Sequence, residues 1–454
     1  MTTPLAPVAV RSELFGPSRR ATTVGLVLLV SLVAFEAMGV GTAMPALVAD
    51  LGAVALYAWP FVSFMAASVF GTVVGGRWCD RAGPRVPLVA APVLFGVGLL
   101  VAGTSTTMAQ LLAGRVLQGL GAGALIVAVY VLIAVVYPER SRPAVFGLMS
   151  AAWVLPSLIG PPLSGVVTEA LSWHWVFLGL LPGVLVAVAL VAPAVRRLGP
   201  PASTGATPKA RRGVIVAALA AAAGVSALSW ASQHVGAAAA AVAAAALVVL
   251  VPALRRLLPR GVFGFRRGVP AVVASRGLIA SVFFTVNAYL PLMLVETHGW
   301  SLAAAGVPLI VGSLGWSAAS GWQGRHPDLD RSRLLRLGFC GVGLGTAGML
   351  LVAPTWGVPW AAAPFWLVAG IGMGLGYSSL SYLVLQQSAD GVLGFNTSAA
   401  QIADQLTTAV MIGLGGALLA LLGAPAAALP VLVALLTALA AAGATLAGRT
   451  RRAT

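Results

Sequence analysis

The sequence predicts an all-α integral membrane protein with fourteen transmembrane helices, arranged as two six-helix bundles with two further helices inserted between them. Of its 454 residues, 59% are hydrophobic and 8% are charged, whereas about 25% are charged in a typical soluble domain. The 27 Lys and Arg and the 11 Asp and Glu residues are too few to give such a chain a polar surface in water. The net charge of +16 therefore indicates membrane topology rather than a nucleic-acid partner.

The length of the apolar stretches predicts the transmembrane helices. A transmembrane helix needs roughly 20 mostly apolar residues, and fourteen stretches satisfy this. The two Ala-rich stretches within 213–254 are the weakest, and a twelve-helix alternative arises only if both are dropped. In order, the stretches are 23–48, 56–77, 86–104, 109–137, 144–168, 173–195, 213–232, 236–254, 270–295, 302–323, 334–353, 358–386, 396–421 and 427–447.

The basic residues alternate along the chain. If the N-terminus is cytoplasmic, 25 of the 27 basic residues fall in the tails and the inward connections, and the outward connections hold none. This distribution satisfies the positive-inside rule and predicts that both termini are cytoplasmic. The other two basic residues, Arg115 and Arg276, lie inside predicted helices.

An internal repeat divides the chain. Pro60 stands sixteen residues before Gly76, and Pro308 stands sixteen before Gly324. A chance coincidence is the alternative, because Gly and Pro are common in this chain. Two halves around an insert are typical of transporters, whose substrate path lies between the halves. The expected domains are an N-terminal six-helix bundle (1–200), a linker with two transmembrane helices (201–268) and a C-terminal six-helix bundle (269–454).

The loop after the second helix carries the most specific motif. It reads GRWCDRAGPR from position 76 and resembles the G-x-x-x-D-R-x-G-R-R signature of the major facilitator superfamily, with Pro84 where a basic residue is usual. The resemblance implies the major facilitator fold, and it implies that the acid latches the two halves on the cytoplasmic side. An ordinary basic loop is the alternative. The gating-loop candidates are Gly76, Asp80, Arg81, Gly83 and Arg85.

Two further motifs resemble the same family. Arg115 opens the sequence RVLQGLGAG, which resembles the R-x-x-Q-G-x-G-x-G pattern of the fourth helix; a buried arginine is costly and needs a partner. The fifth helix resembles the antiporter motif G-x-x-x-G-P-x-x-G-G, with Pro156 and Ser164 replacing two glycines. The motif is associated with exporters. Its candidate residues are Pro156, Gly160, Pro161 and Gly165.

Glu36 is the main candidate for proton coupling. It stands nine residues before Pro45, in a spacing that resembles the first helix of fourteen-helix drug:proton antiporters. Its position about halfway along the first predicted helix places it near the bilayer midplane. A charged carboxylate is costly there, so Glu36 is expected to take up and release a proton. A glutamate that only holds helices together is the structural alternative.

A second acid, Asp404, lies about eight residues into the thirteenth predicted helix. It is a candidate for a second proton site, a contact with a cationic substrate, or the partner of Arg276, which lies at a similar depth. The weaker candidates for cavity lining are Gln118, Asn287, Trp316, Gln401 and Gln405.

The motifs together resemble the fourteen-helix drug:proton antiporter family. The resemblance implies a proton-coupled exporter of lipophilic or cationic small molecules, not an enzyme, with no cofactor besides the proton gradient. It also implies a monomer in the bacterial inner membrane. An exporter of envelope lipids, an importer of a small metabolite and a non-transporting scaffold or sensor are the alternatives. Partners are a small-molecule or lipid substrate and the bilayer, with no nucleic acid. The four histidines lack ligand spacing, so no metal site is expected.

Overall fold

The computed structural model describes residues 14–17, 19–138, 141–197, 213–234, 236–326, 328–388 and 392–451, and within them the regular structure is entirely helical. In this described part of the chain, thirteen helices are long and apolar enough to cross a membrane, and the 17-residue helix Pro87–Gly103 is a shorter apolar one. Each predicted span coincides with one of these fourteen, which confirms the fold class. The N-terminal helices are α2 (Arg20–Asp50), α3 (Trp59–Ala82), α4 (Pro87–Gly103), α5 (Met108–Val136), α6 (Arg142–Ala170), α7 (His174–Leu178) and α8 (Leu181–Arg197).

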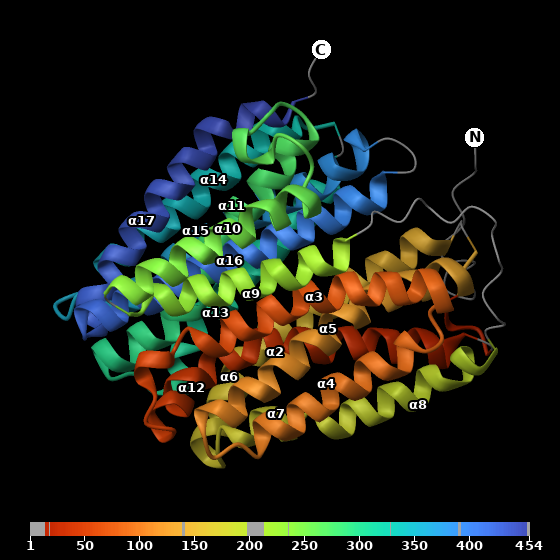
Figure 1. Cartoon of the computed structure of the whole chain (residues 1–454), viewed down its shortest axis with the longest axis horizontal. Helices are drawn as coiled ribbons and strands as arrows, with labels where there is room; N and C mark the ends of the chain where they lie inside the picture. Colours follow the sequence, from red (N-terminus) through yellow and green to blue (C-terminus); the bar gives the residue numbers. More distant parts are fainter. Residues whose placement is uncertain are drawn as a thin grey trace.

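The remaining helices complete a bundle of long, inclined rods (Figure 1). They are α9 (Val214–Ser232), α10 (Ala237–Leu257), α11 (Val269–Leu292), α12 (Leu302–Ala305), α13 (Val307–Gly324), α14 (Arg331–Gly348), α15 (Ala362–Gln387), α16 (Leu393–Leu422) and α17 (Pro425–Leu446). Two predicted spans, 173–195 and 302–323, are each broken into a short and a long helix. Prolines in the first turns of α8 and α13 favour these breaks, because proline lacks the N–H that would continue a helix.

Close contacts between glycines and neighbouring backbones hold the N-terminal helices together. A Cβ atom on Gly75 of α3 would lie 2.6 Å from the Cα of Ala124 in α5, and one on Gly121 of α5 would lie 2.5 Å from the backbone nitrogen of Phe95 in α4. Such separations leave no room for a side chain. Small residues therefore allow these helices to approach closely, as is common between membrane helices.

Helices α2–α8 pack mainly against one another, as do α11 and α13–α17, whereas the short helix α12 packs mainly on α6. The inserted helices α9 and α10 form an antiparallel pair. Helix α9 contacts α3 from the first group and α16 from the second, and α10 packs on α9. The indole of Trp59 in α3 donates a hydrogen bond to Gln233 at the end of α9, over 3.0 Å. The inserted pair thus lies across the junction between the two groups.

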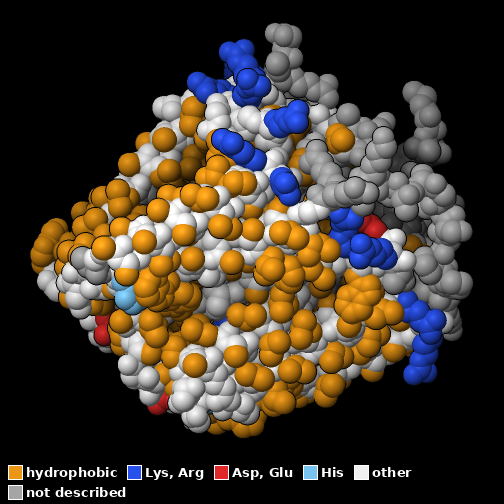
Figure 2. All heavy atoms as spheres, in the orientation of Figure 1, with side chains coloured by type: hydrophobic (Ala, Val, Ile, Leu, Met, Phe, Trp, Pro, Cys, Tyr) orange, Lys and Arg blue, Asp and Glu red, His pale blue; other side chains and the backbone are white. Residues whose placement is uncertain are grey.

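The two ends of the bundle differ in charge. Figure 2 shows Lys and Arg side chains gathered along the upper and right-hand edges of the molecule, with an apolar belt below them. We call this the basic end; it includes the end of α3, the start of α14 and the end of α17. We call the opposite end, which includes α12 and the connection between α2 and α3, the distal end. Charge therefore separates along the helix direction, as expected for a membrane protein.

The two groups of helices touch at the distal end. The hydroxyl of Tyr57 donates to the backbone carbonyl of Ala288 over 2.7 Å, and the rings of Tyr57 and Tyr289 lie 5.2 Å apart. On another side of the junction, a carboxylate oxygen of Glu169 accepts a hydrogen bond from the backbone N–H of Ala303 over 3.2 Å. We call these contacts the distal closure. They join α11 and α12 to the first group of helices.

Candidate functional site

Glu36 and Arg115, both candidates from the sequence, form a buried ion pair. Glu36 lies midway along α2, and Arg115 lies in the first half of α5. Their side chains are 0% and 3% exposed. Arg115 Nη1 donates to Glu36 Oε1 and to Gln118 Oε1. The structure therefore brings three of the predicted residues into one network.

The remaining contacts of Arg115 explain how the membrane interior tolerates it. Its Nε donates to the backbone carbonyl of Pro60 over 3.0 Å, and its guanidinium lies 4.5 Å from the centre of the Phe64 ring. A buried arginine is stable only when its charge is matched and its donors are satisfied. Glu36 Oε2 and Gln118 Nε2 have no hydrogen-bond partner among the described atoms. The pair is electrically neutral, with one carboxylate oxygen left free of hydrogen bonds.

Asp404 and Arg276 form a second pair between α16 and α11. Arg276 Nε lies 3.8 Å from Asp404 Oδ2, and the side chains are 12% and 8% exposed. The hydroxyl of Tyr377 links them, because it donates to Asp404 Oδ2 and accepts from Arg276 Nη2, each over 2.6 Å. Arg276 Nη1 donates to the hydroxyl of Ser381 over 2.8 Å. Of the three roles expected for Asp404, the structure shows the pairing with Arg276.

Sequence reasoning missed Tyr377. The only signal for it is its place directly after the Gly-Leu-Gly run at 374–376, where small residues let α15 approach its neighbours. The Arg276 guanidinium also lies 4.0 Å from the centre of the Tyr377 ring, a cation–π contact. Tyr377 thus contacts Arg276 through both its ring and its hydroxyl.

Aromatic rings continue from this pair. The ring of Trp316 in α13 lies 5.5 Å from Tyr377 and 6.0 Å from Phe284. Behind them, Phe283 stacks on Trp366 at 4.8 Å. Phe283 and Trp366 are buried, whereas the other three rings are half-buried. We call the three half-buried rings, Phe284, Trp316 and Tyr377, the aromatic shelf.

Three weaker cavity candidates lie near the same helices. The amide of Gln405 donates to the hydroxyl of Ser68 in α3 over 3.1 Å, which joins α16 to the first group of helices. Asn287 and Gln401 are half-buried, and no described side chain or backbone group hydrogen-bonds to their amides. Asn287 follows Phe284 by three residues and therefore lies on the same face of α11.

The gating-loop candidates lie at the basic end, where α3 ends and α4 begins. Gly83 ends α3 with a φ of +70°, which explains the glycine because other residues rarely adopt this conformation. Asp80, Arg81 and Arg85 are exposed, and within the described residues no ion pair joins Asp80 to another side chain. Gly76 lies one turn before Asp80 in α3. The latching role of Asp80 stays a prediction.

The fifth-helix motif lies where α6 crosses other helices. Pro156 and Pro161 are inside α6. A Cβ on Gly160 would meet α2 at an ordinary 3.7 Å, whereas one on Gly165 would lie 2.6 Å from the backbone of Ala303 in α12. Gly306, just before α13, packs against the backbone of Pro161. The motif therefore forms a close contact between the two groups of helices near the distal closure.

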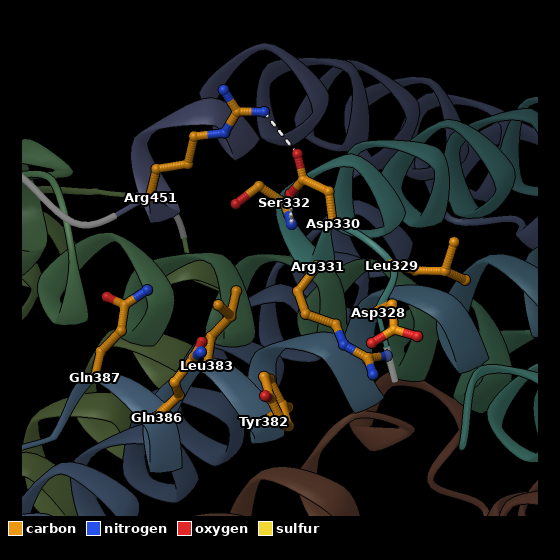
Figure 3. Close-up of a pocket in the computed structure, with 10 residues that line it drawn as sticks. All are labelled: Asp328, Leu329, Asp330, Arg331, Ser332, Tyr382, Leu383, Gln386, Gln387 and Arg451. Carbon is orange, nitrogen blue, oxygen red and sulfur yellow. Dashed lines mark hydrogen bonds and ion pairs between the residues drawn. The ribbon is translucent and has the colours of Figure 1, made fainter. Parts of the chain in front are cut away.

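A pocket of about 420 Å³ opens at the basic end (Figure 3). Asp330 caps α14 there by accepting from the backbone N–H groups of Ser332 and Arg333, and Arg451 Nη2 donates to it over 2.7 Å. Burial acts to raise the pKa of Asp330, but these hydrogen bonds and the charge of Arg451 outweigh it and lower the pKa below its usual value. Arg331 lies over the ring of Tyr382 at 4.9 Å. Sequence reasoning did not predict this pocket.

No set of three His, Cys, Asp or Glu side chains among the described residues is placed to hold a metal ion. The charged side chains buried in the long helices form two neutral ion pairs among the described residues, one enclosed and one beside the aromatic shelf.

Comparison with other proteins agrees with the fold. Residues 26–411 match the family model of the Major Facilitator Superfamily. An uncharacterised MFS-type transporter of Mycobacterium tuberculosis is 30% identical over 418 residues, which cover 87% of this chain and 59% of that protein. Multidrug resistance protein 3 of Bacillus subtilis is 34% identical over 160 residues, 35% of this chain and 31% of that protein. The chain thus spans less than two thirds of these relatives.

Two solved structures share the architecture. The crystal structure of a D-xylose–proton symporter matches with a TM-score of 0.70 at 14% identity, over 95% of this chain and 98% of that one. A POT family transporter in complex with a thioalcohol-conjugated peptide matches with a TM-score of 0.71 at 14% identity, over 98% of this chain and 100% of that one. At such identities the likeness concerns the fold alone. The family match over most of the chain and the helical architecture lead to one conclusion: this multi-pass membrane protein belongs to the major facilitator superfamily of transporters.

Proposed function

We propose that the protein exports lipophilic small molecules across the bacterial inner membrane in exchange for protons, by alternating access between its two groups of helices. The observation that carries this proposal is the buried Glu36–Arg115 pair, because ionisable residues inside membrane helices are costly and commonly mark proton or substrate pathways. The basic end is cytoplasmic in this proposal, in agreement with the positive-inside rule. Each chain holds both ion pairs, so a single copy suffices.

The contacts of Arg115 suit a proton cycle. When the distal side opens, a proton from outside neutralises the Glu36 carboxylate. Arg115 then keeps its hydrogen bonds to Gln118 and to the carbonyl of Pro60, and its contact with Phe64, so that its charge stays partly compensated. When the basic side opens, the proton leaves to the cytoplasm and the ion pair re-forms. Glu36 is thus the residue that carries the proton.

Relatives support export rather than import. Multidrug resistance protein 3 of Bacillus subtilis is named for drug resistance, and the multidrug efflux pump SdrM of Staphylococcus aureus is 29% identical over 170 residues. The fifth-helix motif, which is associated with exporters, lies at the contact between the two groups of helices.

The direct test uses inverted membrane vesicles with an imposed proton gradient. The neutral dye Nile red and the cation ethidium serve as probes. We expect dye to accumulate inside the vesicles only when the proton gradient is present, and a protonophore should abolish this accumulation. Glu36→Gln should abolish it too, whereas Glu296→Gln, the same change at an exposed position, should not. Accumulation that ignores the gradient, or that survives Glu36→Gln, would refute the proposal.

One observation favours lipid export as a second candidate. An apolar groove of about 230 Å³ lies between the distal halves of α9 and α16, lined mainly by Val225, Leu228, Val410 and Met411. A groove of this composition suits an acyl chain. Proteoliposomes with a fluorescent phospholipid distinguish the candidates: movement of the lipid without movement of either dye would favour lipid export.

A further inference from the structure

The charges buried in the membrane-spanning helices cancel. Among the described residues, Glu36 is paired with Arg115, and Asp404 is paired with Arg276. The second pair is the more exposed of the two, at 12% and 8% against 3% and 0%. Neither pair therefore presents an unmatched charge to a molecule that enters between the two groups of helices.

The aromatic shelf adjoins the more exposed pair. Phe284, Trp316 and Tyr377 come from three helices, α11, α13 and α15, yet the centre of the Trp316 ring lies 6.0 Å from that of Phe284 and 5.5 Å from that of Tyr377. All three rings keep part of their surface free. An aromatic ring with a free face or edge can stack on a further aromatic group in an offset or edge-to-face arrangement.

The shelf lies beside a contact with the opposite group of helices. Tyr377 of the shelf donates a hydrogen bond to Asp404 in α16, and the next residue of α16, Gln405, donates to the hydroxyl of Ser68 in α3 over 3.1 Å. On the same face of α11, Asn287 offers an amide that no described group engages. Rings, a neutral ion pair and a free amide thus occupy one side of the junction where a substrate would pass.

We propose that the aromatic shelf, Asn287 and the Arg276–Asp404 pair form a substrate subsite that selects uncharged planar aromatic compounds carrying one polar group, such as a ketone. This inference rests on the proposed function. The rings stack on the aromatic part of the compound, and the Asn287 amide hydrogen-bonds to its polar group. The subsite departs from the expectation of cationic substrates, because Asp404 is already paired.

The selection against ions follows from charge balance. A cation that binds Asp404 leaves Arg276 unmatched, and an anion that binds Arg276 leaves Asp404 unmatched. An unmatched charge away from water is strongly unfavourable. A neutral compound disturbs neither partner. The site therefore discriminates by lowering its affinity for charged compounds rather than by raising its affinity for neutral ones.

Three probes with one ring system test the inference: 2-acetylnaphthalene (neutral), 2-naphthoate (anion) and 2-naphthylmethylammonium (cation). Equilibrium dialysis against the full-length protein in lipid nanodiscs gives their affinities. We expect the neutral probe to bind roughly tenfold or more tightly than either ion, which corresponds to about 1.4 kcal/mol. Trp316→Ala should weaken the binding of all three probes by the same factor.

Removing either charge should switch the order. Asp404→Asn leaves Arg276 unmatched, so the anion should become the best ligand. Arg276→Gln should make the cation the best ligand. The double variant is neutral again and should restore the preference for the neutral probe. Asp328→Asn and Arg333→Gln make the same charge changes at exposed positions of the basic end, and they should keep the wild-type order.

An ion that binds best to the wild-type protein, or single variants that fold but keep the wild-type order, would overturn the inference. Size-exclusion profiles identify variants that fail to fold, and the double variant then decides alone: loss of the neutral preference in it would also overturn the inference. Binding does not require transport. The expected order without proton-driven export would refute the proposed function only, and export with an ion bound best would refute the subsite only.

Discussion

Replacing Glu36 by glutamine should destabilise the protein, because it leaves Arg115 buried without a counter-charge. Breaking a buried ion pair by removing one partner costs about 3–5 kcal/mol. Here Arg115 keeps hydrogen bonds to Gln118 and to the carbonyl of Pro60 and its contact with Phe64, and the new amide oxygen can still accept a hydrogen bond. We therefore expect the lower limit, about 3 kcal/mol.

The double variant Glu36→Gln/Arg115→Gln removes both charges and should recover most of this loss. A double-mutant cycle on thermal unfolding of the purified protein measures the coupling between the two residues. We expect a coupling of about 2 kcal/mol or more. Glu296→Gln serves as the control and should shift the unfolding midpoint little. If the double variant lost as much stability as the two single variants together, the two side chains would not form a pair.

Three further changes have defined outcomes. Tyr377→Phe removes the hydroxyl that links the second ion pair and should cost roughly 2 kcal/mol in thermal unfolding; an unchanged midpoint would contradict the link. Gly121→Ala should cost about 1–3 kcal/mol because its Cβ would lie 2.5 Å from a backbone nitrogen of α4, whereas Gly41→Ala, with nothing within 4 Å, should be neutral or stabilising. The pKa of Asp330 lies below its unfolded value of about 3.9, so its contribution to stability is present above that pH and is lost as the pH falls through the lower, folded pKa. Asp330→Asn should remove this part of the loss of stability at low pH, measured as the unfolding midpoint against pH. An unchanged pH dependence at low pH would exclude Asp330 as its source.

The sequence was sufficient to predict the number of transmembrane helices, because bilayer thickness sets the length of each apolar stretch. The cost of burying a charge keeps most arginines in the connections at one end of the bundle. The sequence was not sufficient to predict the breaks before α8 and α13. A break of one or two residues between apolar segments leaves the local hydropathy unchanged, and proline in the first turn of a helix is also compatible with an unbroken start.

The site was predictable where a single residue is costly on its own. Glu36, Arg115, Arg276 and Asp404 are conspicuous because each is charged within an apolar helix, and partners follow from that cost. Tyr377 is not conspicuous, because a tyrosine in a membrane helix serves packing as readily as hydrogen bonding. The aromatic shelf also escapes detection, because its rings come from three helices whose contacts depend on the tertiary fold.

The distal closure has a consequence for the idle protein. With the basic end toward the cytoplasm, as proposed, the contact of Tyr57 with Ala288 and Tyr289 and that of Glu169 with Ala303 hold the opposite, outward side of the empty carrier together. In the proposed cycle, both contacts separate before a proton from outside reaches Glu36. A cell without substrate would then lose little of its proton gradient through this protein, because leakage is limited by the rate at which those contacts separate.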